Sequence, residues 1–378
     1  MPDLLPCQRA LFDMAEDIAY LNAAAFTPVP RAVQAAGSLG VQTKATPWTP
    51  ALGETESWAD RARAAAAQLI GASPADIALT NAVSYGIATA ARNITIPPGS
   101  RVLMVAEEFP SLAWVWQDLA RAANAALDIV PRPANGDWTE AVLAAITRPG
   151  APPVGLAALT PLHWADGALI DLDVLLPALR AQGAAVVIDA TQAAGVLDVD
   201  VRRWQPDFLA FPTYKWVLGP YSTAFLYAAP HRQSGQPLEQ HGASRDPSGT
   251  HLRDGARRYD RGEYRDPIGL PMAATGLEQI LAWGPAAIAT RLRRLTDELA
   301  AAVADIPGVT ALPPALRAPH ILGLRIAGGL DGLLDGLASH HVTVADRLGV
   351  LRVSPHVYNH SADVTRFATA LRACLAAR

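Results

Sequence analysis

The chain has 378 residues, enough for two domains of ordinary size or for one large domain with a smaller companion. Its 31 basic and 35 acidic side chains give a formal net charge of −4, which argues against nucleic-acid binding as its main function. With 51% hydrophobic and 17% charged residues, the chain can bury a large core and does not have the composition of a disordered protein.

No apolar run approaches the roughly 18 residues of a membrane-spanning helix, so no membrane partner is expected. Residues 1–17 carry acidic side chains early and lack the basic start and apolar core of a secretory signal. The two cysteines, Cys7 and Cys374, suffice for neither a disulfide framework nor a metal site, and no bound metal is expected. These features predict a soluble cytoplasmic enzyme or binding protein.

Helix and strand patterns alternate between residues 57 and 228. Apolar residues at helical spacing predict helices over 57–71, 82–94 and 112–125. Short runs rich in Val, Ile, Leu and Phe predict strands over 76–80, 101–106, 127–131, 154–160, 184–190, 207–212 and 222–228. Strands that alternate with helices indicate a mostly parallel sheet covered on both faces, which binds its ligands at the carboxyl ends of the strands.

The pattern changes at the charged loop 253–265. Beyond it, amphipathic periodicity predicts two long helices within 271–306 and a last helix over 363–378. Apolar runs predict strands over 320–326, 340–345 and 351–357. We therefore expect a large domain over 21–265 and a small α/β domain over 266–378, with residues 1–20 packing on the small domain.

The number of lysines is the most informative count. The chain contains 29 arginines but only two lysines, Lys44 and Lys215. A buried lysine, unlike an arginine, can become a neutral amine that attacks a carbonyl group. Lys44 lies in a Pro/Thr-rich segment predicted to be a solvated loop, whereas Lys215 lies among aromatic and aliphatic residues in FLAFPTYKWVLGP. The alternative for Lys215 is a structural side chain that extends past its apolar neighbours to water.

Further polar and aromatic residues follow predicted strands. Asn81 begins a helix whose free N–H groups form an anion site, Phe109 follows another strand, and Asp189 ends an apolar strand with Gln192 three positions later. Each has a structural explanation by itself, as a helix cap or a core residue. Together with Lys215 they fit pyridoxal 5′-phosphate (PLP), which needs a lysine amine, a phosphate site, a stacking ring and an acid at its pyridine nitrogen.

The segments DATQAAG and FPTYKWVLGPYSTAFLY resemble the core of the class V aminotransferases, the PLP-dependent group that includes cysteine desulfurases, isopenicillin N epimerases and kynureninases. The resemblance extends over nearly the whole chain, from YLNAAAFTPVP through EFPS to RYDRGEY and LRVSPHVYN. It implies the α/β fold of PLP-dependent transferases of fold type I, with a mostly parallel seven-stranded sheet in the large domain and a smaller C-terminal α/β domain. It also implies a homodimer with shared active sites.

The resemblance assigns the residues around the cofactor ring. It implies that Lys215 forms the internal aldimine with PLP, that Asp189 pairs with the pyridine nitrogen and that Gln192 hydrogen-bonds the ring oxygen. Phe109 corresponds to the stacking aromatic residue of kynureninase-like members.

The phosphate site departs from the family pattern. Ala82 and Val83 stand where relatives often have two phosphate-binding threonines. We therefore expect backbone N–H groups, together with Ser84 or Thr213, to bind the phosphate. Tyr214 replaces the histidine that usually precedes the lysine.

A second departure concerns the dimer contact. Gly262 and Glu263 stand where relatives reach the phosphate of the partner subunit, and many relatives have threonine in place of the glutamate. Glu263 would repel a phosphate unless Arg261 or Arg258 offsets its charge.

The resemblance also implies where a substrate binds. Arg352 corresponds to the arginine that holds the substrate carboxylate, a task that suits its planar fork of donors. Other residues map near the substrate: His163, Trp164, Asn22, His356 and Tyr358. For His163 and Trp164, packing or a solvent-facing turn is an equal alternative.

We therefore expect a PLP-dependent enzyme of the aminotransferase or lyase type whose small-molecule substrate is an amino acid, with Lys215 as the general base at Cα. Transamination, racemisation and elimination share this step. A persulfide-forming cysteine desulfurase is disfavoured, because the segment VTVADRLGVLRVSPH lacks the loop cysteine of those enzymes. The alternatives are a C–S lyase without a protein thiol, an epimerase, a non-catalytic PLP-binding protein, or an unrelated α/β enzyme with a structural Lys215.

Overall fold

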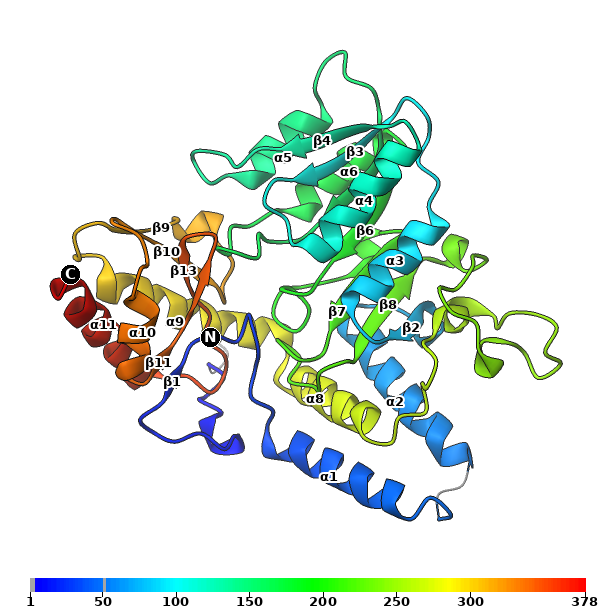
Figure 1. The fold of residues 1–378 in the computed structure, drawn as a ribbon, viewed down its shortest axis with the longest axis horizontal. Coiled ribbons are helices and arrows are strands. Elements are labelled where there is room, and N and C mark those ends of the chain that lie inside the picture. Colours follow the sequence, from blue (N-terminus) through cyan, green and yellow to red (C-terminus); the bar gives the residue numbers. More distant parts are fainter. Residues whose placement is uncertain (1–3, 50–51) are drawn as a thin grey trace.

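A seven-stranded sheet forms the centre of the structure, a computed structural model that describes residues 4–49 and 52–378 (Figure 1). The strand order is β2-β8-β7-β6-β5-β3-β4, and β8 alone runs antiparallel to both of its neighbours. The mostly parallel seven-stranded sheet expected from the sequence is thus confirmed. Its strands are β2 (Ile77–Thr80), β3 (Arg101–Val105), β4 (Ala126–Val130), β5 (Val154–Leu159), β6 (Ala185–Asp189), β7 (Phe208–Pro212) and β8 (Ala224–Ala228).

Helices cover both faces of this sheet because alternate side chains of each strand point to opposite sides. In β7, Phe208 and Ala210 pack in the apolar cluster of α3 (Val83–Asn93) and α4 (Pro110–Ala122). Leu209 and Phe211 pack in the cluster on the other face. The helices of that second face are α2 (Leu52–Leu69), α5 (Trp138–Ile146), α6 (Leu172–Ala181) and α8 (Gly269–Trp283).

Helix α1 (Arg31–Ala45) corrects the expectation that Lys44 lies in a loop. Lys44 is an exposed residue in the last turn of this helix. The helix packs on α8 through small residues: a Cβ atom at Gly40 would lie 2.1 Å from the carbonyl oxygen of Pro267. Because its contact face lacks large apolar side chains, the helix leaves a faint periodic signal in the sequence.

Close packing also fixes the loop that follows Lys215. Gly276 of α8 lies so near this loop that a Cβ atom there would stand 2.6 Å from the carbonyl oxygen of Val217. The backbone after Lys215 is therefore held by a helix that lies far away in the sequence.

The C-terminal part is built on an antiparallel sheet with the order β12-β13-β10-β9, beside α9 (Pro285–Val303), α10 (Leu333–Ser339) and α11 (Ser361–Ala376) (Figure 1). The strand expected over 340–345 is split between β11 and β12. These strands are β9 (Val309–Ala311), β10 (Leu322–Ile326), β11 (Val342–Thr343), β12 (Ala345–Arg347) and β13 (Val350–Val353). Short elements complete the chain: α7 (Val201–Trp204), and the 3₁₀ turns η1 (Arg9–Leu11), η2 (Pro74–Asp76), η3 (Pro230–Arg232), η4 (Gly242–Ser244), η5 (Gly255–Tyr259) and η6 (Pro314–Leu316).

The N-terminal segment contacts these C-terminal elements. Strand β1 (Ala19–Tyr20) pairs with β11 in parallel, and the guanidinium of Arg9 lies 3.5 Å from the carboxylate of Asp363. The division of the chain into domains at about residue 265 stays a prediction.

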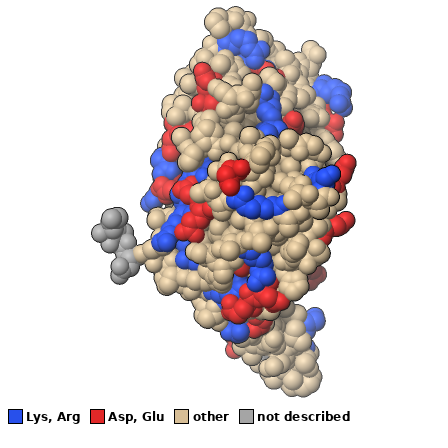
Figure 2. Space-filling model, turned by 90° about the vertical axis from the view of Figure 1, so that its left-hand side faces the viewer, with Lys and Arg blue, Asp and Glu red and all other residues tan. Residues whose placement is uncertain are grey.

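Two surface properties bear on partners. Among the described residues, each helix is too short or too polar to cross a bilayer. On the face shown in Figure 2, basic and acidic side chains are interspersed rather than gathered into a patch of one sign.

Candidate active site

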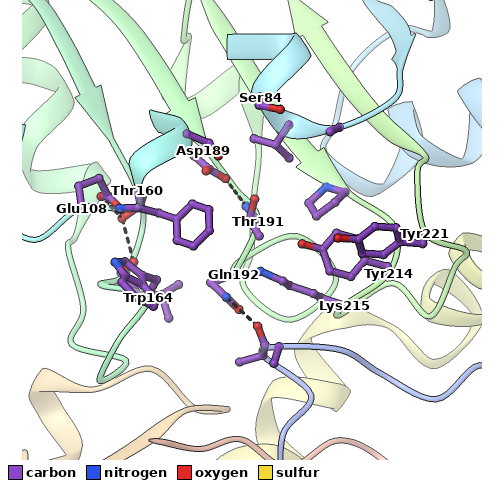
Figure 3. A pocket seen from close by; sticks show the side chains of 18 of the residues that line it. Ser84, Glu108, Thr160, Trp164, Asp189, Thr191, Gln192, Tyr214, Lys215 and Tyr221 are labelled. Atoms are coloured by element: carbon purple, nitrogen blue, oxygen red, sulfur yellow. Dashed lines mark hydrogen bonds between the residues drawn. The ribbon is translucent and has the colours of Figure 1, made fainter. Parts of the chain in front are cut away.

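A cavity of about 400 Å³ opens at the carboxyl ends of the parallel strands, where ligands of such sheets bind. Loops that follow β2, β3, β5, β6 and β7 form its walls, and β12 and β13 each contribute an arginine. Side chains gather on two sides of it (Figure 3), with Glu108, Thr160 and Trp164 on one side and Tyr214, Lys215 and Tyr221 on the other.

Lys215 lines this cavity directly after β7 and is 9% exposed. In the described part of the chain its Nζ has no ion pair or hydrogen bond, and it lies 5.3 Å from the ring centroid of Tyr214. Burial and the charge of Arg352 lower the pKa of the amine to about 8, against an opposing effect of Asp189. A fraction of Lys215 is therefore a neutral, nucleophilic amine near neutral pH.

Asp189 ends β6 and lines the same cavity. Its Oδ1 accepts a hydrogen bond from the backbone N–H of Thr191 at 2.8 Å. Burial raises the pKa of this carboxyl group, while Thr191 and Lys215 act in the opposite direction. A cationic N–H group in the cavity would relieve the cost of burying this carboxylate, which is what a protonated pyridine nitrogen offers.

Two hydrogen bonds orient the side-chain amide of Gln192. Its Oε1 accepts from Trp216 Nε1 at 2.7 Å, and its Nε2 donates to the carbonyl oxygen of Ala24 at 3.0 Å. Because an amide nitrogen has two hydrogens, one donor remains for an oxygen atom in the cavity. This donor fits the ring oxygen of PLP.

His356 does not line the cavity, contrary to its predicted place near the substrate. It is completely buried and stacks on Trp216, which separates it from Gln192. His320 also contacts Trp216, edge-to-face with ring centroids 4.3 Å apart, and its Nε2 lies 2.6 Å from the carbonyl oxygen of Gln192. Burial lowers the pKa of His356 to about 4, so the ring is neutral and acts as packing for Trp216.

The anion site lies at the start of α3, one residue later than expected. The N-cap is Ala82, which makes no side-chain capping bond, so the first N–H groups of the helix face the cavity beside Val83 and Ser84. Asn81 instead accepts a hydrogen bond from Arg261 at 2.8 Å. These free N–H groups fit a phosphate group.

Thr213 is not available to a phosphate. Its hydroxyl lies 2.5 Å and 3.0 Å from the carbonyl oxygens of Pro220 and Thr223, and it does not line the cavity. The residue closes the loop around Lys215 instead, because a buried hydroxyl must satisfy its hydrogen bond locally.

The structure does not bring Gly262 and Glu263 to the cavity of their own chain. Glu263 is exposed, with a left-handed backbone at φ 55°. Arg261 pairs with Asp266 at 3.4 Å, and Arg258 donates to the carbonyl oxygen of Gly235. Neither arginine forms an ion pair with Glu263 among the described residues, so the predicted contact across a dimer stays a prediction.

Two aromatic residues form one wall of the cavity. Phe109 precedes α4, is 44% exposed and meets Trp164 in an edge-to-face contact at 5.3 Å. Trp164 Nε1 donates to the carbonyl oxygen of Glu107 at 2.9 Å. The exposed ring of Phe109 thus provides a surface on which a flat cofactor ring can stack.

Arg352 on β13 is a buried cation without an acidic partner. Nη1 donates to the carbonyl oxygen of Trp164 at 2.9 Å, Nε has no partner, and no described carboxylate lies within ion-pair distance. Burial lowers the pKa of the guanidinium to about 9, which is still well above neutrality. A guanidinium in this state is an anion site with free donors directed at the cavity.

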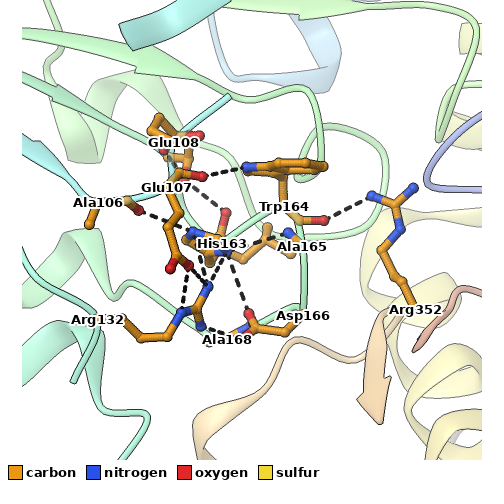
Figure 4. Close-up of polar contacts among 12 residues, drawn as sticks. Ala106, Glu107, Glu108, Arg132, His163, Trp164, Ala165, Asp166, Ala168 and Arg352 are labelled. Atoms are coloured by element: carbon orange, nitrogen blue, oxygen red, sulfur yellow. Dashed lines mark hydrogen bonds and ion pairs between the residues drawn. The ribbon is translucent and has the colours of Figure 1, made fainter. Parts of the chain in front are cut away.

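His163 and Asn22 lie outside the cavity, contrary to their expected place near the substrate. His163 stacks on Trp138 with an interplanar angle of 3° and is enclosed by Arg132 and Asp166 (Figure 4). These contacts position the loop whose Trp164 carbonyl accepts from Arg352. Asn22 pairs with Ser354 by a backbone bridge. Tyr358 is completely buried and does not line the cavity.

Sequence analysis missed two charged residues of the cavity, Glu108 and Arg347. Glu108 Oε1 accepts from the backbone N–H of Phe109 at 2.6 Å, and burial, helped by the charge of Asp189, raises the pKa of this carboxyl group to about 8. The only sequence signal was the position of both residues at strand ends. Among the described residues, no three His, Cys, Asp or Glu side chains gather closely enough to hold a metal ion.

The raised pKa of Glu108 predicts a pH-dependent stability. An unfolded chain loses this proton near pH 4.5, whereas the folded chain keeps it up to about pH 8, so the group lowers stability as the pH rises between these values. The Glu108→Gln variant is expected to have the same Tm as the wild type at pH 4.5 and a Tm about 2–4 °C higher at pH 8. Both values are measured by thermal unfolding of the protein without cofactor. An equal difference at both pH values would contradict a neutral Glu108.

Comparison with known proteins agrees with this site. The family model described as "Aminotransferase class-V" matches residues 19–367. Isopenicillin N epimerase of Streptomyces clavuligerus is 28% identical over 376 residues, covering 93% of this chain and 94% of that protein. Kynureninase of Deinococcus radiodurans is 31% identical over 238 residues, covering 60% of this chain and 55% of that protein. The crystal structure of a cysteine desulfurase from Escherichia coli has a TM-score of 0.85 at 20% identity, covering 98% of both chains, which shows the shared fold.

The chain therefore belongs to the class V aminotransferase family. Members of this family are enzymes that depend on PLP, so the family, fold type, enzyme class and cofactor predicted from the sequence are confirmed. The matched proteins include an epimerase, a kynureninase and a desulfurase, and the family alone does not fix the reaction.

Proposed function

We propose that this protein binds PLP at Lys215 and acts on an α-amino acid. The observation that carries the proposal is a buried lysine amine that forms no ion pair among the described residues and shares one cavity with Asp189 and Gln192. When bound, PLP withdraws electrons from the bonds at the substrate Cα. Asp189 would hold the pyridine nitrogen, the second Nε2 hydrogen of Gln192 the ring oxygen, and Phe109 the face of the ring.

The remaining cavity residues divide between the phosphate and the substrate. The N–H groups at Ala82, Val83 and Ser84 would hold the phosphate, because the first N–H groups of α3 have no side-chain cap and lie at the cavity. Arg352 would hold the α-carboxylate of the substrate. Lys215 Nζ would accept the proton from Cα and return it, because its lowered pKa places it near the working pH of a general base.

The position of the cysteines supports the view that this is not a persulfide-forming desulfurase. The chain has two cysteines, and neither Cys7 nor Cys374 lines the cavity. Where those enzymes carry a loop cysteine, this chain has the hairpin of β12 and β13, closed by Leu348 and Gly349. Aminotransferase, epimerase and thiol-independent C–S lyase reactions are all compatible with proton transfer by Lys215. The alternative to these enzymes is a protein that binds PLP without catalysis, and the experiment below distinguishes the two.

We also propose that the protein is a homodimer, as the family implies, and that it acts in the cytoplasm. Exposed aromatic residues beside the cavity support a partner contact: Tyr221 is 62% and Phe26 is 53% exposed, with ring centroids 5.7 Å apart. Sedimentation equilibrium of the purified protein tests the dimer directly.

The test of the function begins with the purified protein loaded with PLP. Amino acids, as D and L forms, are added singly while the visible absorbance of the cofactor is recorded, and keto acid, ammonia, sulfide and the opposite enantiomer are assayed. We expect a spectral change with at least one amino acid and one of these products. A cofactor that binds but responds to no amino acid in the set would contradict an enzyme of this kind and favour a non-catalytic binding protein.

A further inference from the structure

The cavity contains a second arginine, Arg347, in addition to the one needed for an α-carboxylate. Arg347 is the last residue of β12 and pairs with Val350 of β13 in an antiparallel hairpin. Leu348 and Gly349 form the two-residue turn between them with φ of 55° and 75°, the combination that favours a tight hairpin. A short hairpin of this kind holds Arg347 and Arg352 at a fixed relative position on one wall of the cavity.

Arg347 has no acidic partner among the described residues. Its one recorded hydrogen bond runs from Nη1 to the carbonyl oxygen of its neighbour Asp346, and the carboxylate of Asp346 accepts instead from the backbone N–H of Gly349. The guanidinium therefore keeps most of its donors for a ligand. Its charge also acts on both Arg352 and Lys215, which places it close to the other cationic groups of the site.

The charged groups that line the cavity are unbalanced. Lys215, Arg347 and Arg352 are basic, whereas the acidic groups are Asp189 and Glu108. Asp189 is the acid expected at the pyridine nitrogen, and Glu108 stays protonated near neutral pH because it is buried. An α-carboxylate offsets Arg352. With the cofactor phosphate assigned to the N–H groups at the start of α3, no carboxylate among the described residues of the cavity is left to offset the charge of Arg347. An arginine cannot remove that charge by losing a proton.

We propose that Arg347 forms a second anion site and that the substrate is an acidic α-amino acid whose side-chain carboxylate binds there. The proposal rests on the proposed function, in which Arg352 takes the α-carboxylate. The two guanidiniums would hold the two ends of a dicarboxylate, and the apolar side chains of Leu162 and Trp164 on the cavity wall would contact the methylene groups between them. Specificity would arise because a neutral side chain offers no anion to the half-buried guanidinium of Arg347.

The first test uses ligands that carry no amine. Succinate, glutarate and adipate are titrated into the PLP-loaded protein by calorimetry, with butyrate as the single-carboxylate control. We expect the best diacid to bind at least about ten-fold more tightly than butyrate. Arg347→Gln is expected to remove this preference without changing butyrate binding, and Arg347→Lys to restore part of it. Arg325→Gln, at the exposed position of β10, makes the same charge change outside the cavity and should have no effect.

The second test follows the cofactor absorbance with aspartate, glutamate and 2-aminoadipate against asparagine and glutamine. We expect at least one of the acidic amino acids to bind at least about ten-fold more tightly than the amides. In Arg347→Gln, the ratio of the affinities for the acid and the amides should be close to one. Diacid binding that is no tighter than butyrate binding, or that Arg347→Gln leaves unchanged, overturns the proposal. If no amino acid alters the absorbance although the diacids bind through Arg347, the proposed function fails while the anion site stands.

Discussion

Lys215→Ala is expected to abolish the covalent attachment of PLP, the visible absorbance band that goes with it, and turnover. Lys215 is the one lysine that lines the cavity, and its Nζ has no other described partner that could explain its burial. Loss of the general base alone lowers kcat by roughly 10²–10⁴-fold. The measurement is the absorbance spectrum of the variant after it has been incubated with PLP, together with kcat for the best substrate.

The second lysine provides a matched control. Lys44→Ala removes an exposed amine from α1 and should leave the spectrum and kcat unchanged. Borohydride reduction followed by peptide mapping should place the cofactor mass on the peptide that holds Lys215. A mass on Lys44, or an intact absorbance band in the Lys215 variant, would show that the cofactor is attached elsewhere.

The lowered pKa of Lys215 also predicts how the attachment of PLP depends on pH. The neutral amine attacks the PLP aldehyde, so the rate of PLP capture by cofactor-free protein should rise as the pH approaches about 8 and level off above it. An ordinary lysine would show this rise near pH 10.5.

Arg352→Gln is expected to weaken the binding of amino acids by roughly 100-fold, with the cofactor spectrum retained. The substitution removes the buried guanidinium that would donate two hydrogen bonds to the α-carboxylate. Loss of one member of a buried charged pair typically weakens binding by two or more powers of ten. The measurement is the apparent Kd for the best amino acid, taken from the cofactor absorbance.

Two controls separate binding from folding in this experiment. The amine that corresponds to the amino acid without its carboxylate should bind the wild type and the variant equally. Arg352→Lys should recover only part of the affinity, because an ammonium group lacks the planar fork. If the amine and the amino acid weaken to the same extent, Arg352 supports the structure of the site and does not bind the carboxylate.

Much of the fold and the core of the site could be predicted because those signals are local. The strands β5, β6 and β7 are buried on both faces, so each is a continuous apolar run that stands out in the sequence. The carboxyl ends of parallel strands meet at one edge of a sheet, which places Asp189 and Lys215 together without any further information. Helix α1 lacked such a signal because it packs through glycines.

The remaining errors share one cause, which is that a side chain's neighbours come from distant segments. Thr213 satisfies its hydroxyl within its own loop, His163 packs on Trp138, and His356 packs behind Trp216. A residue one or two positions from a strand end can face the cavity or the core, and this choice depends on packing across the sheet. No local pattern distinguishes the two cases.

The amino-acid sequence by itself determined the seven strands β2 to β8 of the large sheet, the cofactor and the lysine that would hold it, because hydrophobic runs and a rare residue type are properties of the chain alone. Only the tertiary structure decided the charge balance of the cavity. The protonation of Glu108 and the unpaired cations of Arg347 and Arg352 depend on how far each group is from water and from opposite charges. Those distances exist only once segments remote in sequence have packed together.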